Sequence, residues 1–174
     1  MTRKIVNLPA SVHSRLLNMA NSEGQAFIDL LVLFANERFL YRLSQTTYAE
    51  KFVLKGAMAI LNLGMAHPRY TRDIDFSGYL ELNISHIEEI MREVCELPVV
   101  DDGLIFDSTS FTCDLIKAHD QYPGVRVRLL ASLGKSEVHL QVDIGVGDAV
   151  YPPAEPAKYP GLLDFPQATI RCYR

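Results

Sequence analysis

Two carboxylates separated by one residue are the first candidates for chemistry in this sequence. Asp73 and Asp75 flank Ile74 in a segment where polar and apolar residues alternate from Thr71 onward. On an extended strand alternate residues share a face, so the two carboxylates would project side by side, about 6–7 Å apart at the backbone. Like charges at that distance are costly unless a cation lies between them, which predicts bound Mg²⁺ or Mn²⁺. The spacing alone leaves a second interpretation open, a solvated strand face.

A third carboxylate lies inside another apolar strand. Asp143 stands between Val142 and Ile144 in the predicted strand Val138–Ile144. An unpaired carboxylate is expensive to bury, so Asp143 needs an ion-pair partner or a metal ion. The alternative is that the strand ends there and that Asp143 meets solvent before Gly145. We predict that Asp143 joins the Asp-x-Asp pair in one metal-binding cluster.

Arginine, lysine and glycine residues that suit a phosphate group lie near these carboxylates in the sequence. Arg69 and Arg72 directly precede the Asp-x-Asp pair. Lys55, Gly56 and Ala57 mark the point where a predicted strand turns into a predicted helix. A glycine there lets a phosphate approach the backbone and the free N–H groups of the helix. We predict that these five residues bind a phosphate group, such as that of a nucleotide, although for the glycine motif taken alone an ordinary turn is favoured.

Two further arginines have two interpretations. Arg126 and Arg128 share one face of the predicted strand Val125–Leu133. They either bind phosphate or RNA, or keep an edge strand soluble. The histidines show no zinc-site spacing, and the three cysteines are read as thiols of a reducing compartment.

Size and charge limit the class of protein. The chain of 174 residues is long enough for one domain with a hydrophobic core. Its formal net charge of −4 means that contact with RNA needs a local basic patch. No apolar run is long enough for a membrane span, and no signal peptide is evident. We therefore expect a cytoplasmic protein without a membrane partner.

The order of predicted elements indicates an α+β domain with a mixed, mainly antiparallel sheet and N-terminal helices. Helical periodicity predicts helices over Ser11–Asn21, Gln25–Leu43, Ala57–Leu63 and Ile84–Leu97. Alternation and turn residues predict strands over Lys51–Lys55, from Thr71, and over Leu104–Lys117, Val125–Leu133 and Val138–Ile144, the last two as a hairpin. The sequence beyond Gly147 is predicted to be loop. We divide the chain into an N-terminal helical segment (1–50), a core (51–150) and a proline-rich tail (151–174).

Taken in order, several motifs resemble the AbiEii/AbiGii-type nucleotidyltransferase toxins, whose fold is polymerase-β-like. The three motifs that carry the candidate residues are Phe52–Ala59, Arg69–Asp75 and Leu140–Asp148. Two further segments, Asn36–Ser44 and Tyr159–Pro166, are similar to one branch of that family. The resemblance covers nearly the whole chain.

The resemblance implies Mg²⁺-dependent transfer of a nucleoside monophosphate from an NTP to an acceptor hydroxyl on tRNA or protein. It implies a bacterial toxin of a toxin–antitoxin or phage-defence pair, with a cognate antitoxin protein as partner. Asp73, Asp75 and Asp143 match the metal-binding and catalytic carboxylates, and Asp143 would favour deprotonation of the attacking hydroxyl. Gly56 and Ala57 match the phosphate-holding motif, although the family often has Gly-Ser or Gly-Gly there.

Members of that family usually continue past the equivalent of Cys172–Arg174 into a helical region that contributes a nucleotide-binding lysine. We therefore expect this chain to be truncated at its C-terminus relative to them. Two other functions stay open. One is an inactive remnant that binds a partner protein through an exposed apolar patch. The other is a phosphohydrolase that uses the same carboxylates on water.

Overall fold

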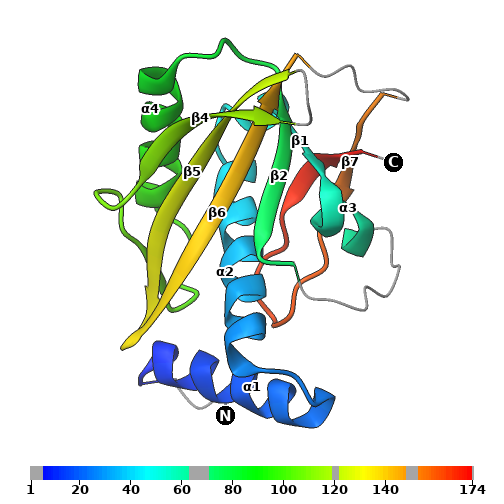
Figure 1. The fold of residues 1–174 in the computed structure, drawn as a ribbon. Helices are drawn as coiled ribbons and strands as arrows, with labels where there is room; N and C mark the ends of the chain where they lie inside the picture. The colour runs from blue at the N-terminus through cyan, green and yellow to red at the C-terminus, as the bar shows by residue number, and fades with distance from the viewer. Residues whose placement is uncertain (1–5, 63–70, 119–121, 148–152, 174) are drawn as a thin grey trace.

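The computed structural model describes residues 6–62, 71–118, 122–147 and 153–173. Helices α2 (Phe27–Ser44) and α4 (Ile84–Glu96) lie behind a curled mixed sheet, and α1 (Leu8–Glu23) lies below it in the view of Figure 1. The short helix α3 (Gly56–Asn62) packs beside β1 (Phe52–Lys55). This arrangement confirms the predicted α+β class. Within the described residues, no helix is long and apolar enough to cross a membrane.

In the described part of the chain, one eight-stranded sheet places two strands with predicted site residues side by side. Its order is β3-β5-β6-β2-β1-β8-β7, and β4 also pairs with β5. The pairings are antiparallel except β2 with β6 and β1 with β8, which run parallel. The other strands are β2 (Asp73–Gly78), β3 (Leu104–Phe106), β4 (Thr112–Ala118), β5 (Tyr122–Leu133), β6 (Ser136–Val146), β7 (Glu155–Lys158) and β8 (Thr169–Cys172).

Alternation along the strands separates an apolar face from a polar face. Ile74 and Phe76 in β2, and Val142 and Ile144 in β6, are fully buried. They join Phe34 of α2 in one hydrophobic core, on the face of the sheet that α2 covers. The intervening residues of β2 and β6 include the three predicted carboxylates, and they therefore project from the opposite face.

Asparagine caps explain where two of the helices begin. α1 begins at Leu8, earlier than the predicted Ser11, because Asn7 Oδ1 accepts a hydrogen bond from the backbone N–H of Ala10 at 3.1 Å. α4 is capped in the same way by Asn83. Its Oδ1 accepts from the backbone N–H of His86 at 3.2 Å.

The prediction of one strand over Leu104–Lys117 is wrong, because a turn divides it into β3 and β4. Asp107 Oδ1 accepts hydrogen bonds from the backbone N–H and the hydroxyl of Thr109, at 2.9 and 2.7 Å. The N–H of Ser110 donates to the Asp107 carbonyl at 3.1 Å. This turn lets β3 and β4 pair with different parts of β5.

The prediction that the tail beyond Gly147 is loop is also wrong in part. Strands β7 and β8 form an antiparallel pair, and β8 runs parallel to β1. The N–H of Tyr173 donates to the Leu54 carbonyl at 2.8 Å. The tail thus extends the sheet beside the strand that carries Lys55.

Segment 159–168, which joins β7 to β8, is held against α2 by side chains of that helix. The N–H of Leu162 donates to Glu37 Oε2 at 2.8 Å, and Arg38 Nη1 donates to the Pro166 carbonyl at 2.6 Å. These contacts join Asn36–Ser44 to Tyr159–Pro166, the two further segments that resemble the family and that lie far apart in the chain. They also place β8 next to β1.

Two arginines of α2 share one buried carboxylate. Arg38 Nε lies 3.0 Å from Asp102 Oδ2, and Arg42 contacts both oxygens of Asp102 at 2.7 and 3.1 Å. Burial alone would raise the pKa of Asp102, but the hydrogen bonds and charge of Arg42, together with Arg38, outweigh it and lower that pKa. Breaking such a buried pair typically costs about 3–5 kcal/mol, so this cluster fixes α2 against the loop before β3.

Glu37 lies in the same buried region and makes stability depend on pH. Burial raises the pKa of Glu37 from 4.5 to about 7, against the opposing effects of the Leu162 N–H and Arg38. The nearby charge of Asp102 raises it further. Because the folded pKa lies above the unfolded one, the stabilisation is present at low pH and is lost as pH rises through about 7.

We expect the free energy of unfolding of the wild type, relative to Glu37→Gln, to fall by about 3 kcal/mol between about pH 4.5 and 8. Urea unfolding at a series of pH values measures this difference. Glu93→Gln, at an exposed position of α4, is the matched control and should follow the wild type within about 0.5 kcal/mol. If the free energies of unfolding of wild type and Glu37→Gln differed by the same amount at every pH in this range, the raised pKa of Glu37 would be contradicted.

Candidate active site

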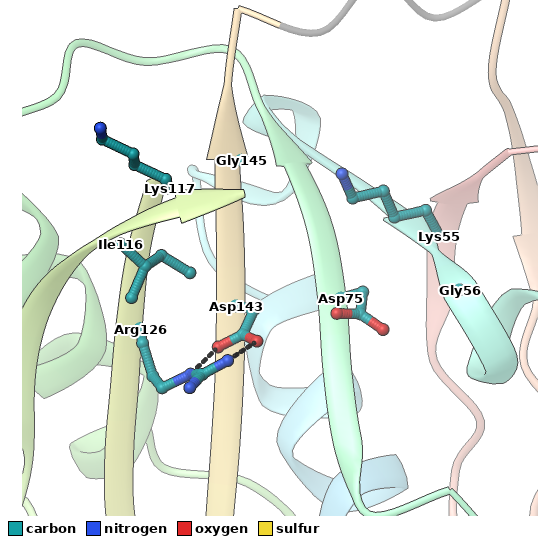
Figure 2. A pocket seen from close by; sticks show the side chains of 8 residues that line it. All are labelled: Lys55, Gly56, Asp75, Ile116, Lys117, Arg126, Asp143 and Gly145. Carbon is teal, nitrogen blue, oxygen red and sulfur yellow. Dashed lines mark hydrogen bonds and ion pairs between the residues drawn. The ribbon is translucent and has the colours of Figure 1, made fainter. Parts of the chain in front are cut away.

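Two of the predicted carboxylates lie at neighbouring positions of the parallel strands β2 and β6. In the register between β2 and β6, Asp75 is the partner of Asp143, and Asp73 is the partner of Gln141. β6 continues to Val146, so the alternative in which the strand ends at Asp143 is wrong. Backbone pairing itself brings Asp75 and Asp143 to neighbouring positions (Figure 2).

Charged residues continue in the same register on both sides of this pair. Lys55 of β1 is the partner of Asp75, and Arg126 of β5 is the partner of Asp143. Asp114 of β4 is in turn the partner of Arg126. One row across the sheet therefore carries a lysine, two aspartates, an arginine and a further aspartate. Flanking cations of this kind reduce the repulsion between the two central carboxylates.

Arg126 binds Asp143 through two nitrogens of its guanidinium group. Nε lies 2.9 Å from Oδ1 and Nη2 lies 2.9 Å from Oδ2, a bidentate arrangement (Figure 2). The side chains of Arg126 and Asp143 are 33% and 18% exposed, so solvent screens the pair only in part. The hydrogen bonds to Asp143 raise the pKa of Arg126, burial opposes them, and the charges of Asp143, Asp73 and Asp75 raise it further.

The interpretation of Arg126 and Arg128 as solubilising residues of an edge strand is wrong. β5 pairs with β6 on one side and with β3 and β4 on the other, so it lies inside the sheet. Arg128 contacts Asp114 at 3.4 Å and is 52% exposed. Arg126, by contrast, contacts a predicted site residue. The sequence marked Arg126 as a candidate, but its partner follows from the register of the β5–β6 hairpin.

A pocket of about 420 Å³ opens at this row of charges. Its volume is in the range of about 300–1,000 Å³ that is common for small-molecule sites. The residues that line it are Lys55, Gly56, Asp75, Ile116, Lys117, Arg126, Asp143 and Gly145 (Figure 2). Ile116 and Lys117 come from the end of β4 and were not predicted. No local motif marks them, because only the pairing of β4 with β5 brings them to the pocket.

Two of the other predicted residues line a neighbouring pocket of about 330 Å³. Asp73 is exposed and lies there with Arg72 and Arg128. Arg72 Nη2 also contacts Asp29 Oδ1 at 3.1 Å. Arg69 lies outside the described residues.

The donor chemistry of the first pocket fits a hard divalent cation. Asp75 and Asp143 supply carboxylate oxygens, and one or two carboxylates suffice for Mg²⁺ when substrate phosphates and water complete its shell. In the described part of the chain, no group of three or more His, Cys, Asp or Glu side chains is placed to hold a metal ion. The ligand set of Asp73, Asp75 and Asp143 therefore stays a prediction.

Gly56 forms the turn from β1 into α3, and Ala57 follows it in that helix. Its φ of +68° lies in the left-handed region that favours glycine. A Cβ at this position would collide with Asp75 Oδ2 and would lie 3.1 Å from Asp75 Cγ. The glycine therefore lets the Asp75 carboxylate lie directly against the backbone at the start of α3.

The helix-backed mixed sheet, with carboxylates of two central strands beside a glycine turn, agrees with the nucleotidyltransferase fold that the sequence motifs predict. The chain belongs to the nucleotidyl transferase AbiEii toxin family of type IV toxin–antitoxin systems, whose family model matches residues 38–174. The resemblance based on the sequence motifs is thus confirmed.

Two solved structures from Helicobacter pylori match this chain, and the first of them is similar in fold. The protein JHP933 matches with a TM-score of 0.50 and 20% identity, over 84% of this chain and 52% of its own. A provisionally assigned nucleotidyltransferase matches with a TM-score of 0.48 and 20% identity, over 83% of this chain and 53% of its own. This chain thus spans about half the length of the solved structures that it matches. No curated protein matches it.

We expect Gly56→Ala to destabilise the protein by about 3 kcal/mol, because it adds a collision with Asp75 to the strain of a left-handed residue. Gly24→Ala is the matched control, since Gly24 has a φ of +65° but nothing within 4 Å of the position that a Cβ would take. It should cost only about 1–2 kcal/mol. Denaturant unfolding of both variants measures the difference, and equal losses would contradict the close approach of Asp75.

Proposed function

We propose that the pocket beside Asp75 and Asp143 binds a nucleoside triphosphate together with Mg²⁺ or Mn²⁺, for transfer of its nucleoside monophosphate to an acceptor hydroxyl. The observation that carries this proposal is the β2–β6 register, which puts both carboxylates in the wall of a pocket that also contains Lys55, Lys117 and Arg126. Carboxylates for a metal and cations for phosphates are the groups that a metal–triphosphate complex requires. Membership of the AbiEii family supports the same reaction class.

The cationic and acidic residues of the pocket would have different roles in this reaction. Lys55 and Lys117 lie on opposite sides of the pocket in Figure 2, where their ammonium groups would attract the triphosphate. Gly56 would bring Asp75, and the phosphates of a metal bound to it, close to the backbone at the start of α3. Asp143 would accept the proton of the attacking hydroxyl. Arg126 would stabilise negative charge on the phosphates.

Mg²⁺ held by Asp75 and Asp143, with Asp73 as the third ligand that the family resemblance implies, would polarise the phosphate oxygens and offset their charge. The carboxylates hold that position because they belong to paired backbones rather than to a loop. A rigid site of this kind needs little reorganisation when substrate binds.

The acceptor and the partners are part of the same proposal. The pocket of Arg72, Asp73 and Arg128 adjoins the carboxylate row and offers cations to an acceptor that carries phosphate, such as the end of a tRNA. A hydroxyl of a protein is the other acceptor class. The family to which the chain belongs implies an antitoxin as the partner of the whole protein. We propose a cytoplasmic toxin of a toxin–antitoxin or phage-defence pair.

We expect Asp75→Asn to weaken binding of the metal–triphosphate complex by more than about 100-fold, because loss of a direct ligand should exceed the roughly 10–100-fold cost of outer-shell changes. Calorimetric titration of the chain with Mg²⁺ and each of the four NTPs measures this effect. Asp114→Asn is the matched control, since Asp114 lies in the same row but outside the pocket. Equal affinity in wild type and Asp75→Asn would exclude this pocket as the nucleotide site.

The same preparation separates the reaction classes. With α-labelled NTP and total tRNA or protein, a nucleotidyltransferase labels the acceptor and releases pyrophosphate. A phosphohydrolase releases phosphate or nucleotide without labelling either acceptor. A folded chain that binds no NTP at all would favour the protein-binding role.

A further inference from the structure

Both carboxylate oxygens of Asp143 are engaged by side chains of the protein. Arg126 contacts each oxygen at 2.9 Å, and Gln141 Nε2 donates to Oδ2 at 3.4 Å. A guanidinium fork of this kind uses one lone pair on each carboxylate oxygen, and Gln141 contacts a further position on Oδ2. A divalent cation bound to Asp143 would also lie within a few ångströms of the positive guanidinium group, which is strongly unfavourable in a partly shielded site.

Arg126 interacts with more than one carboxylate. Asp75 is the strand neighbour of Asp143, and the charges of Asp73, Asp75 and Asp143 all act on Arg126. Lys55 lies beyond Asp75 in the same row, at the other end from Arg126. The guanidinium group thus already provides, at Asp143, the positive charge that a pair of adjacent carboxylates requires.

We propose that Arg126 is an internal counter-ion of the carboxylate pair, which a divalent metal must displace from Asp143 and which then binds the triphosphate. This inference rests on the proposed function, because the displaced guanidinium needs an anion to receive it. Arg126 lines the same pocket as Lys55 and Lys117, so phosphate oxygens in that pocket lie within reach of its side chain. Arginine pairs with phosphate in the same bidentate manner as with a carboxylate.

The exchange couples metal binding to nucleotide binding. A metal ion alone must break the Arg126–Asp143 pair and then stay close to an unpaired guanidinium group. When a triphosphate is present, the guanidinium group moves to a new anion and the carboxylate is released to the metal. Each ligand therefore raises the affinity for the other at the protein, beyond the association of metal and triphosphate in solution.

If Arg126 had a purely structural role, its removal would change the affinity for metal in the opposite direction. If Arg126 only held Asp143 in the correct orientation, its removal would loosen a metal ligand and weaken metal binding. If Arg126 is a counter-ion, its removal leaves two adjacent carboxylates without that charge, and metal binding becomes tighter. The affinity for metal alone therefore separates the two roles without any measurement of activity.

The experiment measures binding of Mn²⁺ alone to wild type and to Arg126→Gln, from the electron paramagnetic resonance signal of the free ion, with and without inorganic tripolyphosphate. We expect Arg126→Gln to bind Mn²⁺ alone at least about tenfold more tightly than the wild type. Tripolyphosphate should increase the Mn²⁺ affinity of the wild type but not that of Arg126→Gln. The variant should also melt at lower temperature without metal, and Mn²⁺ should restore its melting temperature.

Two variants serve as controls. Arg92→Gln removes an exposed arginine of α4 that lines neither of the two pockets. It should bind Mn²⁺ as the wild type does. Arg126→Lys keeps the charge and loses the fork, so its affinity for Mn²⁺ alone should stay within about threefold of the wild type. It also keeps the test valid if Arg126→Gln does not fold.

Unchanged or weaker binding of Mn²⁺ alone by Arg126→Gln would overturn the counter-ion role. If the wild type nevertheless binds a metal–NTP complex in a manner that requires Asp75, the proposed function stands without it. If the wild type binds no Mn²⁺ even with tripolyphosphate and NTP, the proposed function and the counter-ion role both fail.

Discussion

The candidate site depends on one constraint, the placement of two like charges at neighbouring positions of paired parallel strands. Asp75 and Asp143 cannot move apart, because the β2–β6 register also pairs the buried residues Ile74 and Phe76 with Val142 and Ile144 on the opposite face. A shift of one residue would turn the carboxylates into the core and the apolar side chains out of it. The energy of the core therefore maintains an electrostatic arrangement that is unfavourable by itself. Lys55 and Arg126, on either side of the two carboxylates, reduce that cost.

The remainder of the fold positions β1, the strand that pairs with β2 next to Asp75 and leads into the Gly56 turn. β1 carries Lys55 and leads into Gly56 at the start of α3, and its other edge is covered by β8. β8 is placed there by segment 159–168, which Glu37 and Arg38 hold against α2. Arg38 is itself fixed by the buried Asp102. The side-chain contacts of α2 and the pairing of β8 with β1 thus connect the long helix behind the sheet to the strand that leads into the Gly56 turn.

Much of the fold class and part of the site follow from local sequence patterns. Alternation around Asp73 and Asp75, and the apolar neighbours of Asp143, predicted strands with a polar face, and the structure pairs those strands directly. The features that were missed depend on contacts between distant segments. The partner of Asp143 is set by a hairpin register, and Lys117 reaches the pocket only because the Asp107 turn lets β4 pair with β5. The four-residue strands β7 and β8 carry too short a pattern to be recognised beside the prolines of the tail.

We propose that Asp75 and Asp143 together hold a metal ion at a triphosphate site. A crystal structure of the chain with Mn²⁺ and a non-hydrolysable NTP analogue, with anomalous data at the manganese edge, tests it most directly. We expect a manganese peak bound by both carboxylates, with the phosphates between Lys55 and Lys117 and near the start of α3. Bound analogue in another part of the molecule, with Asp75 and Asp143 free of manganese, would contradict it.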